Sequence, residues 1–396
     1  MHEQRTWLYV ISWRLAELGG VNQVVSNLFD RTRAQLGFEP LLLVRSWEHA
    51  DASVSIVDGR RTVHARVPSP WFKTHQLRNA LAYVVKLPSL AVKLAKLLRE
   101  RHVTVVNVHY PDLSALVWVV LRDWFHLDIR LVWAFHGMDV RAATAGASGP
   151  RWLWRWVLHA ADRIVVCADD LGDILRMRWG VPADRIVTIG NGVDVRHVQE
   201  VASIPPTSPV PKPYIMSIGT YEAKKGHDLL IQAFAQLAER HPQWSLVIAG
   251  RAGEPQAWER AQRLRAASPA PDRVVLLKDV AHPEAMRLLR GSSIFALASR
   301  QEPFGIVVLE AGALGRPAVV SDACGVVRKL SPGVDIETVP NEDVDALARA
   351  LDAFMSDPAR AQQVGSALRQ RVESEFDWSS VVRQWSSQVL LQRPSR

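Results

Sequence analysis

The sequence predicts an α/β protein with two domains, each built on a sheet of buried parallel strands. Short apolar runs alternate with longer segments of helical periodicity along most of the 396 residues. A stretch with five prolines and no periodicity, residues 198–213, interrupts this alternation. The length suffices for two separate cores. We therefore expect a first domain over 1–198, a semi-rigid linker over 199–213, a second domain over 214–375 and a terminal helix over 376–396.

The composition is that of an ordinary globular protein. Hydrophobic residues make up 48% and charged residues 22%, and no apolar run reaches the roughly 18 residues of a membrane-spanning helix. Cys167 and Cys324 stand alone in apolar surroundings, which predicts neither a disulfide framework nor a metal site. The first residues run straight into a strand without the pattern of a signal peptide. We expect a reducing, cytoplasmic location.

Apolar runs predict the strands of the first domain at 6–12, 40–45, 53–57, 62–67, 103–108, 131–135, 163–167 and 185–189. Gly19 and Gly20 follow the first run and precede a helix expected over 22–35. This loop either brings backbone close to a ligand or forms only a tight turn. His136, Gly137, Met138 and Asp139 follow the strand at 131–135, so His136 lies at the carboxyl end of a strand, where parallel sheets bind ligands. A neutral imidazole there is able to hydrogen-bond a sugar hydroxyl, although a single histidine is more often structural.

Two segments of the first domain combine basic and apolar side chains. The net charge is +8, and the segment from Trp71 to Arg101 is predicted as an amphipathic, basic helix pair broken near Pro88. The segment from Pro150 to Ala161 carries three tryptophans and two arginines in one short helix. Its Trp152 and Trp156 share a face, and Trp154 lies off that face, which is unusual for a monomer surface. Each segment is either a core helix with a solvated basic side or a face that lies on anionic lipid headgroups.

The second domain has strands predicted at 214–219, 244–250, 273–277, 293–297 and 317–321. Lys225 and Gly226 lie in the loop after the first of them, and Lys225 is either a solvated lysine before a helix or a ligand for phosphate. Towards the end of the chain, apolar residues at helical spacing predict the terminal helix: Phe376, Trp378, Val381, Val382 and Trp385.

Residues 298–322 contain the most informative pattern, a strand end, a polar loop over 299–305, an apolar helix over 306–314 and the next strand. The backbone N–H groups at the helix start around Gly305, with the positive end of the helix dipole behind them, suit a phosphate. Glu302 precedes the helix, and Glu310 lies roughly 7–8 Å further along its axis at about 1.5 Å per residue. Two carboxylates so placed fit two sets of hydroxyls on one ligand, or else a helix cap and a surface ion pair. A carboxylate within the apolar run is costly without a partner, which favours a function for Glu310.

The segment E-P-F-G-I-V-V-L-E-A, residues 302–311, resembles the Glu, seven residues, Glu signature of retaining glycosyltransferase family 4. The segments A-S-R-Q-E-P-F-G, G-R-P-A-V-V-S, G-G-V, H-G-M-D and N-G-V-D are also similar to that family. The resemblance extends from Gly19 to the terminal helix. It implies the GT-B fold, in which two Rossmann-like domains with parallel sheets face a central cleft and the terminal helix, residues 376–396, packs back on the N-terminal domain.

The resemblance also implies roles for individual residues. Catalysis is expected from His136, Lys225 and Glu302, donor binding from Gly20, Thr220, Lys225, Arg300, Phe304, Gly305, Ile306 and Glu310, and acceptor contacts from Gly19, His136 and Asp139. Lys225 and the helix start take the diphosphate, Glu302 the sugar hydroxyls and Glu310 the ribose. No metal is expected, because no clustered carboxylates resemble a metal site. No cofactor is expected either, because the nucleotide diphosphate sugar is a co-substrate.

Two positions depart from the family pattern. Thr220 stands where the family has an arginine that neutralises the leaving diphosphate together with the lysine, so Lys224 or Arg300 is expected to take its place. Residues 277–280 lack the usual glycine, which predicts a different nucleobase pocket.

The expected function is transfer of a hexose, with retention of configuration, from a nucleotide diphosphate sugar to a glycan or lipid-linked glycan in surface polysaccharide or glycolipid assembly. If the segments from Trp71 to Arg101 and from Pro150 to Ala161 contact anionic lipid, the protein is peripheral on the inner leaflet of the cytoplasmic membrane. One alternative is a GT-B nucleotide-sugar epimerase, which needs no acceptor. The other is a basic nucleic-acid-binding protein, and the tryptophan-rich helix shows no base-reading pattern to support it, so no nucleic-acid partner is expected.

Overall fold

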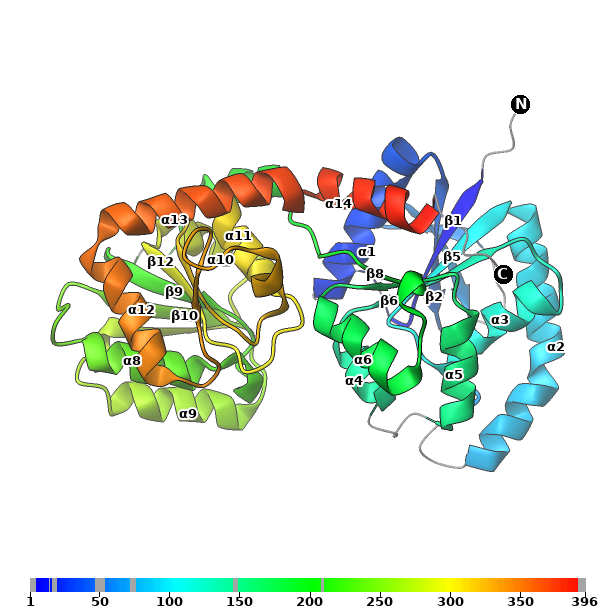
Figure 1. Ribbon diagram of the computed structural model, residues 1–396, viewed down its shortest axis with the longest axis horizontal. Helices are drawn as coiled ribbons and strands as arrows, with labels where there is room; N and C mark the ends of the chain where they lie inside the picture. Colours follow the sequence, from blue (N-terminus) through cyan, green and yellow to red (C-terminus); the bar gives the residue numbers. More distant parts are fainter. Residues whose placement is uncertain are drawn as a thin grey trace. The chain divides into compact units, whose positions relative to one another are not determined.

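The structure is a computed structural model that describes residues 5–13, 15, 20–46, 54–71, 76–144, 149–207 and 210–390. The described chain divides into two compact units (Figure 1). The first unit runs up to Gly190 and resumes at Val381, and the second comprises Asn191–Ser380. Each unit is a predominantly parallel sheet with helices packed against it, as the alternation of apolar runs and helical periodicity predicts.

The first unit contains an eight-stranded sheet among its described residues, in the order β3-β4-β2-β1-β5-β6-β7-β8. Neighbouring strands are parallel except β3 and β4. The strands are β1 (Thr6–Ile11), β2 (Glu39–Arg45), β3 (Val54–Val57), β4 (Arg60–Ala65), β5 (Val103–His109), β6 (Arg130–Phe135), β7 (Arg163–Val166) and β8 (Ile186–Thr188). The helices are α1 (Gly20–Arg31), α2 (Gln76–Glu100), α3 (Leu116–Asp123), α4 (Met138–Thr144), α5 (Arg151–Ala160) and α6 (Asp169–Trp179). The central strand β1 is buried at every position, as expected for a sheet covered on both faces.

The second unit contains a six-stranded parallel sheet in the order β11-β10-β9-β12-β13-β14. Its strands are β9 (Tyr214–Ile218), β10 (Ser245–Gly250), β11 (Val274–Lys278), β12 (Ile294–Leu297), β13 (Ala318–Ser321) and β14 (Glu337–Val339). Its helices are α7 (Val195–Ala202), α8 (His227–Leu237), α9 (Pro255–Ala266), α10 (His282–Gly291), α11 (Ile306–Ala313), α12 (Val344–Ser356) and α13 (Pro358–Arg371). Side chains from α8, α9 and α12 join those of the strands in one apolar core.

The strand orders place the candidate site residues. In the second unit the chain builds outward from β9 in one direction and from β12 in the other, so the order reverses between these two strands. Parallel sheets bind ligands at the carboxyl ends of strands beside such a reversal. Lys225 follows β9 and Glu302 follows β12. In the first unit the reversal lies between β1 and β5, with Gly20 after β1 and His136 after the next strand, β6.

Several local expectations differ from the structure. The segment from Trp71 to Arg101 is not a broken helix pair, because α2 continues through Pro88 without interruption. A proline removes only its own N–H, and the C-terminal half of α2 is held by burial of residues such as Leu94 and Leu98 against β5 and α3. The helix expected over 22–35 ends its regular part at Arg31 and closes with a π-helical turn, Thr32–Leu36.

The tryptophan-rich helix α5 presents the opposite face from the one expected. Trp154 is 2% exposed and lies against Trp179, with ring centroids 6.3 Å apart, whereas Trp152 is 68% and Trp156 37% exposed. The buried face consists of Leu153, Trp154, Val157 and Leu158. The tryptophans of the solvent side are therefore the pair four residues apart.

The start of the predicted linker and much of the predicted terminal helix are helical in the structure. The first residues expected in the linker belong to α7, which packs on α10 and α11 of the second unit. At the other end, α14 (Trp378–Trp385) spans the division and a π-helical turn, Ser386–Leu390, follows it. Trp385 packs on Trp7 in the first unit, with ring centroids 6.3 Å apart.

Candidate active site

The loop before α11 is tied to the segment after β13. Gly325 N donates to Glu302 O at 3.0 Å and Val326 N to Phe304 O at 2.8 Å. Gly305 has φ +97°, and a Cβ there would lie 2.5 Å from Cys324 Sγ, so only glycine fits. Burial, with a further contribution from Glu302, raises the pKa of the Cys324 thiol well above its ordinary value, so this cysteine is a packing residue. The glycine therefore sets the position at which α11 begins.

The start of α11 has the geometry of an anion site. Its first intrahelical bond runs from Val308 N to Gly305 O at 3.0 Å, so the amides of Ile306 and Val307 precede the hydrogen-bonded ladder. Phe304 is buried, and its ring centroid lies 6.4 Å from that of Phe376. This packing anchors the loop that precedes α11. The helix dipole adds positive potential at the same point.

Lys225 and Glu302 are brought together, as the sequence predicts. They come from loops after β9 and β12, and Lys225 Nζ forms an ion pair with Glu302 Oε2. Both side chains are mostly buried, at 20% and 12% exposure. The two loops are also joined through backbone, because Arg300 N donates to Lys224 O at 2.8 Å. One cation and one carboxylate thus stand together beside the start of α11.

Glu310 lies on α11 and is 6% exposed. Its Oε1 meets Nε2 of His282, the first residue of α10, at 2.7 Å. The hydrogen bond to Glu310 raises the pKa of His282, against the opposing effect of burial. Sequence reasoning missed His282; the only signal for it was a histidine at a helix start in the region assigned to the nucleobase.

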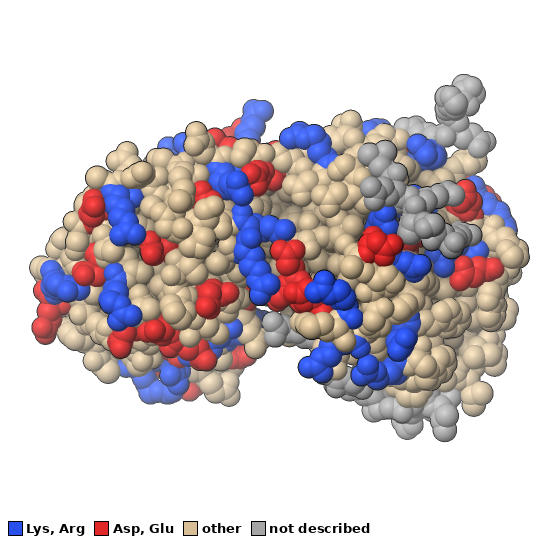
Figure 2. Space-filling model, in the orientation of Figure 1, with Lys and Arg blue, Asp and Glu red and all other residues tan. Residues whose placement is uncertain are grey.

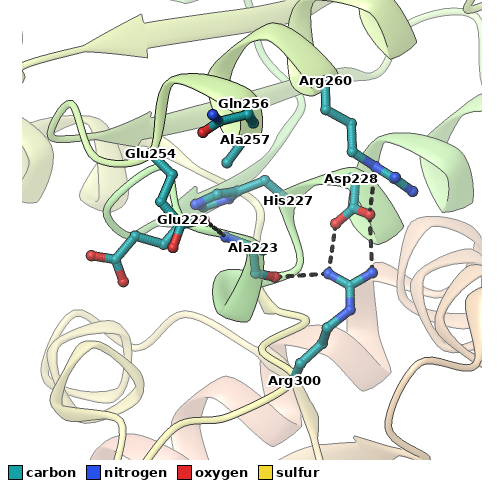
Figure 3. Close-up of a pocket in the computed structure, with 9 residues that line it drawn as sticks. All are labelled: Glu222, Ala223, His227, Asp228, Glu254, Gln256, Ala257, Arg260 and Arg300. Carbon is teal, nitrogen blue, oxygen red and sulfur yellow. Dashed lines mark hydrogen bonds and ion pairs between the residues drawn. The ribbon is translucent and has the colours of Figure 1, made fainter.

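Arg300 does not join Lys225. Its guanidinium makes two bonds to Asp228, at 2.8 and 2.9 Å, and a third to Ala223 O (Figure 3). A fourth bond, to Glu342, measures 2.6 Å. Arg260 also pairs with Asp228, at 3.0 Å. Arg300, Asp228 and Arg260 line a pocket of about 200 Å³ between the starts of α8 and α9. Arg300 was expected to replace the arginine missing at position 220, but its guanidinium already pairs with the carboxylates of Asp228 and Glu342.

Thr220 and Lys224 supply no free charge either. Thr220 O accepts from Glu222 N at 2.8 Å and lies 3.3 Å from His227 Nε2. Burial lowers the pKa of His227 to about 4, so this ring is neutral at pH 7. Lys224 pairs with Glu222 at 2.5 Å. Among the described residues named for the diphosphate, Lys225 is the cation that the structure places beside Glu302.

In the first unit, Asp139 holds the loop that carries His136. Asp139 Oδ1 accepts from the amides of His136, Gly137 and Val140 at 2.8–3.0 Å. Asp139 is 3% exposed, and burial raises the pKa of its carboxyl to about 6 while these bonds oppose the rise. Asp139 thus acts on the backbone of the loop, and His136 is the side chain of this pair that remains partly exposed.

His136 has a partner that the sequence did not suggest. His109, the last residue of β5, places Nδ1 3.1 Å from His136 Nε2, and its Nε2 lies 3.1 Å from Asn107 Oδ1. Burial lowers the pKa of His136 to about 4 and that of His109 well below the ordinary value. The available signal in the sequence was that His109 lies at the carboxyl end of β5, the strand beside β6, and that His136 directly follows β6.

Two glycines and the arrangement of possible metal ligands remain to be described. Gly20 is the exposed first residue of α1, and Gly19 lies outside the described residues. Within the described ranges, no group of three or more histidine, cysteine, aspartate or glutamate side chains is arranged to hold a metal ion.

Two family models match the chain in succession. "Glycosyltransferase Family 4" matches residues 18–197, and "Glycosyl transferases group 1" matches residues 199–371. Glycogen synthase of Mycobacterium tuberculosis is 28% identical over 389 residues, which cover 94% of this chain and 92% of that protein. Phosphatidyl-myo-inositol mannosyltransferase of Mycolicibacterium smegmatis is 26% identical, covering 92% of this chain and 88% of that protein.

Solved structures share the fold at low sequence identity. A glycosyltransferase from Rickettsia africae matches with a TM-score of 0.75 and 16% identity, covering 99% of this chain and all of that one. Alr3699/HepE of Anabaena, in complex with UDP and glucose, matches with a TM-score of 0.69 and 16% identity, covering 99% of this chain and all of that one.

Proposed function

The chain belongs to retaining glycosyltransferase family 4, has the GT-B fold and is a hexosyltransferase that uses nucleotide sugars; from this premise we propose that it transfers a hexose from a nucleotide diphosphate sugar to a lipid-linked sugar acceptor at a membrane surface. The observation that carries the donor half is the Lys225–Glu302 pair beside the start of α11. The acceptor half is supported by an exposed apolar face on α2 with basic side chains along it.

The donor is held in parts by one end of the second sheet. The diphosphate docks on the amides of Ile306 and Val307 and on Lys225 Nζ, since both supply positive potential. Glu302 takes hydroxyls of the transferred hexose, and Glu310 accepts from the ribose hydroxyls. Both acids are paired in the structure, Glu302 with Lys225 and Glu310 with His282, so donor hydroxyls replace or share an existing partner.

The reaction breaks the bond between the anomeric carbon and the diphosphate oxygen. Negative charge grows on that oxygen as it leaves, and amides and an ammonium group already fixed in place stabilise it. The acceptor hydroxyl attacks on the face that the diphosphate leaves, and its proton passes to the leaving phosphate oxygen. This keeps the configuration of the sugar and needs no covalent intermediate.

A thermal-shift panel with UDP, GDP and ADP identifies the base, because a ligand that binds only the folded state raises its stability. With that nucleotide, we expect Lys225→Ala to lower affinity at least about tenfold, as loss of a charged contact costs roughly 1.5–3 kcal/mol. The control is Lys224→Ala, the neighbouring lysine, which pairs with Glu222. Undiminished affinity of K225A for all three nucleotides would overturn the donor assignment. Conversion of labelled nucleotide sugar without an acceptor would favour the epimerase alternative.

The membrane half rests on the exposed side of α2. Leu81, Val84, Val85 and Val92 are each at least 59% exposed, and Lys86, Lys93 and Lys96 are exposed beside them. Spacings of three, four and seven residues put the apolar side chains on one stripe. A stripe of this kind edged by lysines matches anionic headgroups above an apolar lipid boundary. No helix in the described ranges is both long and apolar enough to cross a bilayer.

The solvent face of α5 supports the same surface. Trp152 and Trp156 are exposed on it, and both α5 and α2 pack on α3. Tryptophan prefers the interface between headgroups and lipid tails. The related mycobacterial mannosyltransferase is named for a phosphatidylinositol acceptor, which agrees with a lipid-linked acceptor here. On the face drawn in Figure 2, basic and acidic side chains are interspersed, which does not match the basic stripe of a nucleic-acid-binding protein.

Sedimentation with liposomes tests the membrane half. We expect binding to vesicles of phosphatidylglycerol and phosphatidylcholine, little binding to phosphatidylcholine alone, and loss of binding in Val85→Asp. Met177→Asp is the matched control, because Met177 is also exposed, at 73%, but lies on α6 of the same unit. Equal recovery of the protein in the supernatant with both kinds of vesicle would refute the proposal.

A further inference from the structure

Three side chains form a buried chain of hydrogen bonds that ends at His136. Asn107 and His109 lie two residues apart on β5 and so point to the same side of the sheet. Asn107 Nδ2 donates to Val132 O on the neighbouring strand β6 at 3.3 Å, and Asn107 Oδ1 lies 3.1 Å from His109 Nε2. His109 Nδ1 lies 3.1 Å from His136 Nε2. Asn107 and His109 have no exposed surface.

The two imidazoles meet edge to edge. Their planes differ by only 19°, and their ring centroids are 5.3 Å apart while the facing nitrogens are 3.1 Å apart. The nitrogens therefore lie between the two ring centres, as an N–H···N hydrogen bond requires. Trp385 and Tyr9 cover His109, with ring centroids 6.3 and 6.0 Å away. Water is thus kept from the inner end of the chain.

The donor and the acceptor of each hydrogen bond in this chain follow from its inner end, at Val132 O. Val132 O can only accept, so the amide nitrogen of Asn107 faces it and the amide oxygen faces His109. That oxygen can only accept, so His109 Nε2 carries a proton. A fully buried imidazole is neutral, which leaves His109 Nδ1 bare. His136 Nε2 must then carry the proton that His109 Nδ1 accepts.

We infer that Asn107 and His109 are positioning residues that fix His136 as the tautomer with a protonated Nε2 and a bare Nδ1, so that His136 meets its ligand as a hydrogen-bond acceptor. Among the described residues, no partner occupies His136 Nδ1, and the His136 side chain is partly exposed. A bare imidazole nitrogen accepts from a hydroxyl and cannot donate to a phosphate oxygen. The ligand group at this position therefore donates a hydrogen bond, and we take it to be a hydroxyl. The assignment of this hydroxyl to a sugar rests on the proposed function, whereas the assignment of the tautomer is independent of it.

The tautomer is measured on the free full-length protein. Two-bond ¹⁵N–¹H NMR spectra of protein labelled at histidine separate bare from protonated ring nitrogens, and His136→Gln identifies the His136 signals by their loss. At pH 7.5, in wild-type protein, we expect a bare Nδ1 and a protonated Nε2 for His136. A protonated Nδ1 would overturn the inference. No substrate is present, so this result is independent of the proposed function.

A variant of the buried end separates positioning from stability. Asn107→Leu removes the amide that orients His109, so we expect His136 to populate both tautomers. Val105→Ala, two positions earlier on the same face of β5, is the control: it perturbs the packing of that buried face but leaves the three polar groups intact. An unchanged His136 tautomer in N107L would show that Asn107 does not set it. If N107L does not fold, His109→Phe replaces it, with loss of the single wild-type tautomer as the expected result and its persistence as the contrary one.

Discussion

Gly226 is the residue at which the geometry of the donor loops is most easily tested. It ends the short 3₁₀ turn Ala223–Lys225 and precedes α8, with φ +65°. A Cβ built there would lie 1.9 Å from the carbonyl oxygen of Ala298 and 2.8 Å from its carbon. Ala298 follows β12 and begins the loop that leads to Glu302. We expect Gly226→Ala to push the two donor loops apart.

The free energy of unfolding that Gly226→Ala is expected to cost has two parts. A left-handed backbone costs an alanine about 1–2 kcal/mol. Forcing a methyl group into packed atoms adds about 1–3 kcal/mol, and the contact here is with backbone, which yields less than a side chain. Gly333→Ala isolates the first part, because Gly333 has φ +77° in the same unit and nothing within 4 Å of its Cβ position. We therefore expect a loss of about 1–2 kcal/mol for G333A and about 2–5 kcal/mol for G226A.

Differential scanning calorimetry of the full chain measures this difference. For a unit of this size each kcal/mol lowers the melting temperature by roughly 2–4 °C. G226A should also weaken binding of the nucleotide found in the thermal-shift panel, since Lys225 adjoins the displaced residue, whereas G333A should not. Equal melting temperatures for the two variants would refute the close approach of the loops. A destabilised G226A protein with wild-type nucleotide affinity would show that the approach does not position Lys225.

Three further predictions concern buried or paired charged side chains. Glu310→Gln should weaken nucleotide binding about tenfold, a loss near 1.4 kcal/mol. Because Glu310 raises the pKa of His282, the stability that their pair adds is present below the ordinary histidine pKa of 6.5 and is lost as pH rises through the raised pKa. The difference between the urea midpoints of wild type and E310Q should therefore narrow from pH 6 to pH 9. Asp139→Asn should lose about 1–3 kcal/mol at pH 7: the amide oxygen can replace Oδ1, which accepts from three amides, but the amide NH2 replaces Oδ2, which accepts from His136 N at 2.9 Å. Asp139→Ala should cost at least about 3 kcal/mol. Because burial raises the pKa of folded Asp139 to about 6, the stability of wild type relative to D139N should fall as pH rises from 4 to 6 in the same measurement, and a flat difference would argue against a buried charge. Arg300→Lys should lose about 1–2 kcal/mol of stability with its two bonds to Asp228, but should change nucleotide affinity far less than Lys225→Ala; an equal loss of affinity would return Arg300 to the donor site.

The fold class and the donor loops were predictable because they depend on local patterns. Apolar runs bounded by glycine and proline mark buried parallel strands, and the loops at their carboxyl ends gather Lys225 and Glu302 wherever the strand order reverses. The reversal itself is a tertiary property. His109 and His282 were missed for the same reason, since each acquires its meaning from a partner on another element, His136 and Glu310 respectively.

Local rules failed where packing decides between alternatives. A proline predicts a helix break, but the burial of the C-terminal half of α2 outweighs one missing hydrogen bond at Pro88. Helix α5 is apolar on more than one side, so its sequence does not specify which tryptophans turn inward. Trp179 on α6 provides the surface on which Trp154 packs, and Trp152 is left exposed as a result.

The missing arginine at position 220 bears on how the donor site works. The two cations expected to replace it are already paired, Lys224 with Glu222 and Arg300 with Asp228, while Lys225 pairs with the acid expected to hold the sugar. A bound diphosphate therefore draws Lys225 away from Glu302 or shares it, and either change leaves Glu302 with unfilled acceptor capacity. Sugar hydroxyls are the groups that fill such capacity. In the proposed donor site, phosphate and sugar binding would thus be coupled through a single ion pair, and a nucleotide lacking the sugar should bind with the carboxylate of Glu302 incompletely satisfied.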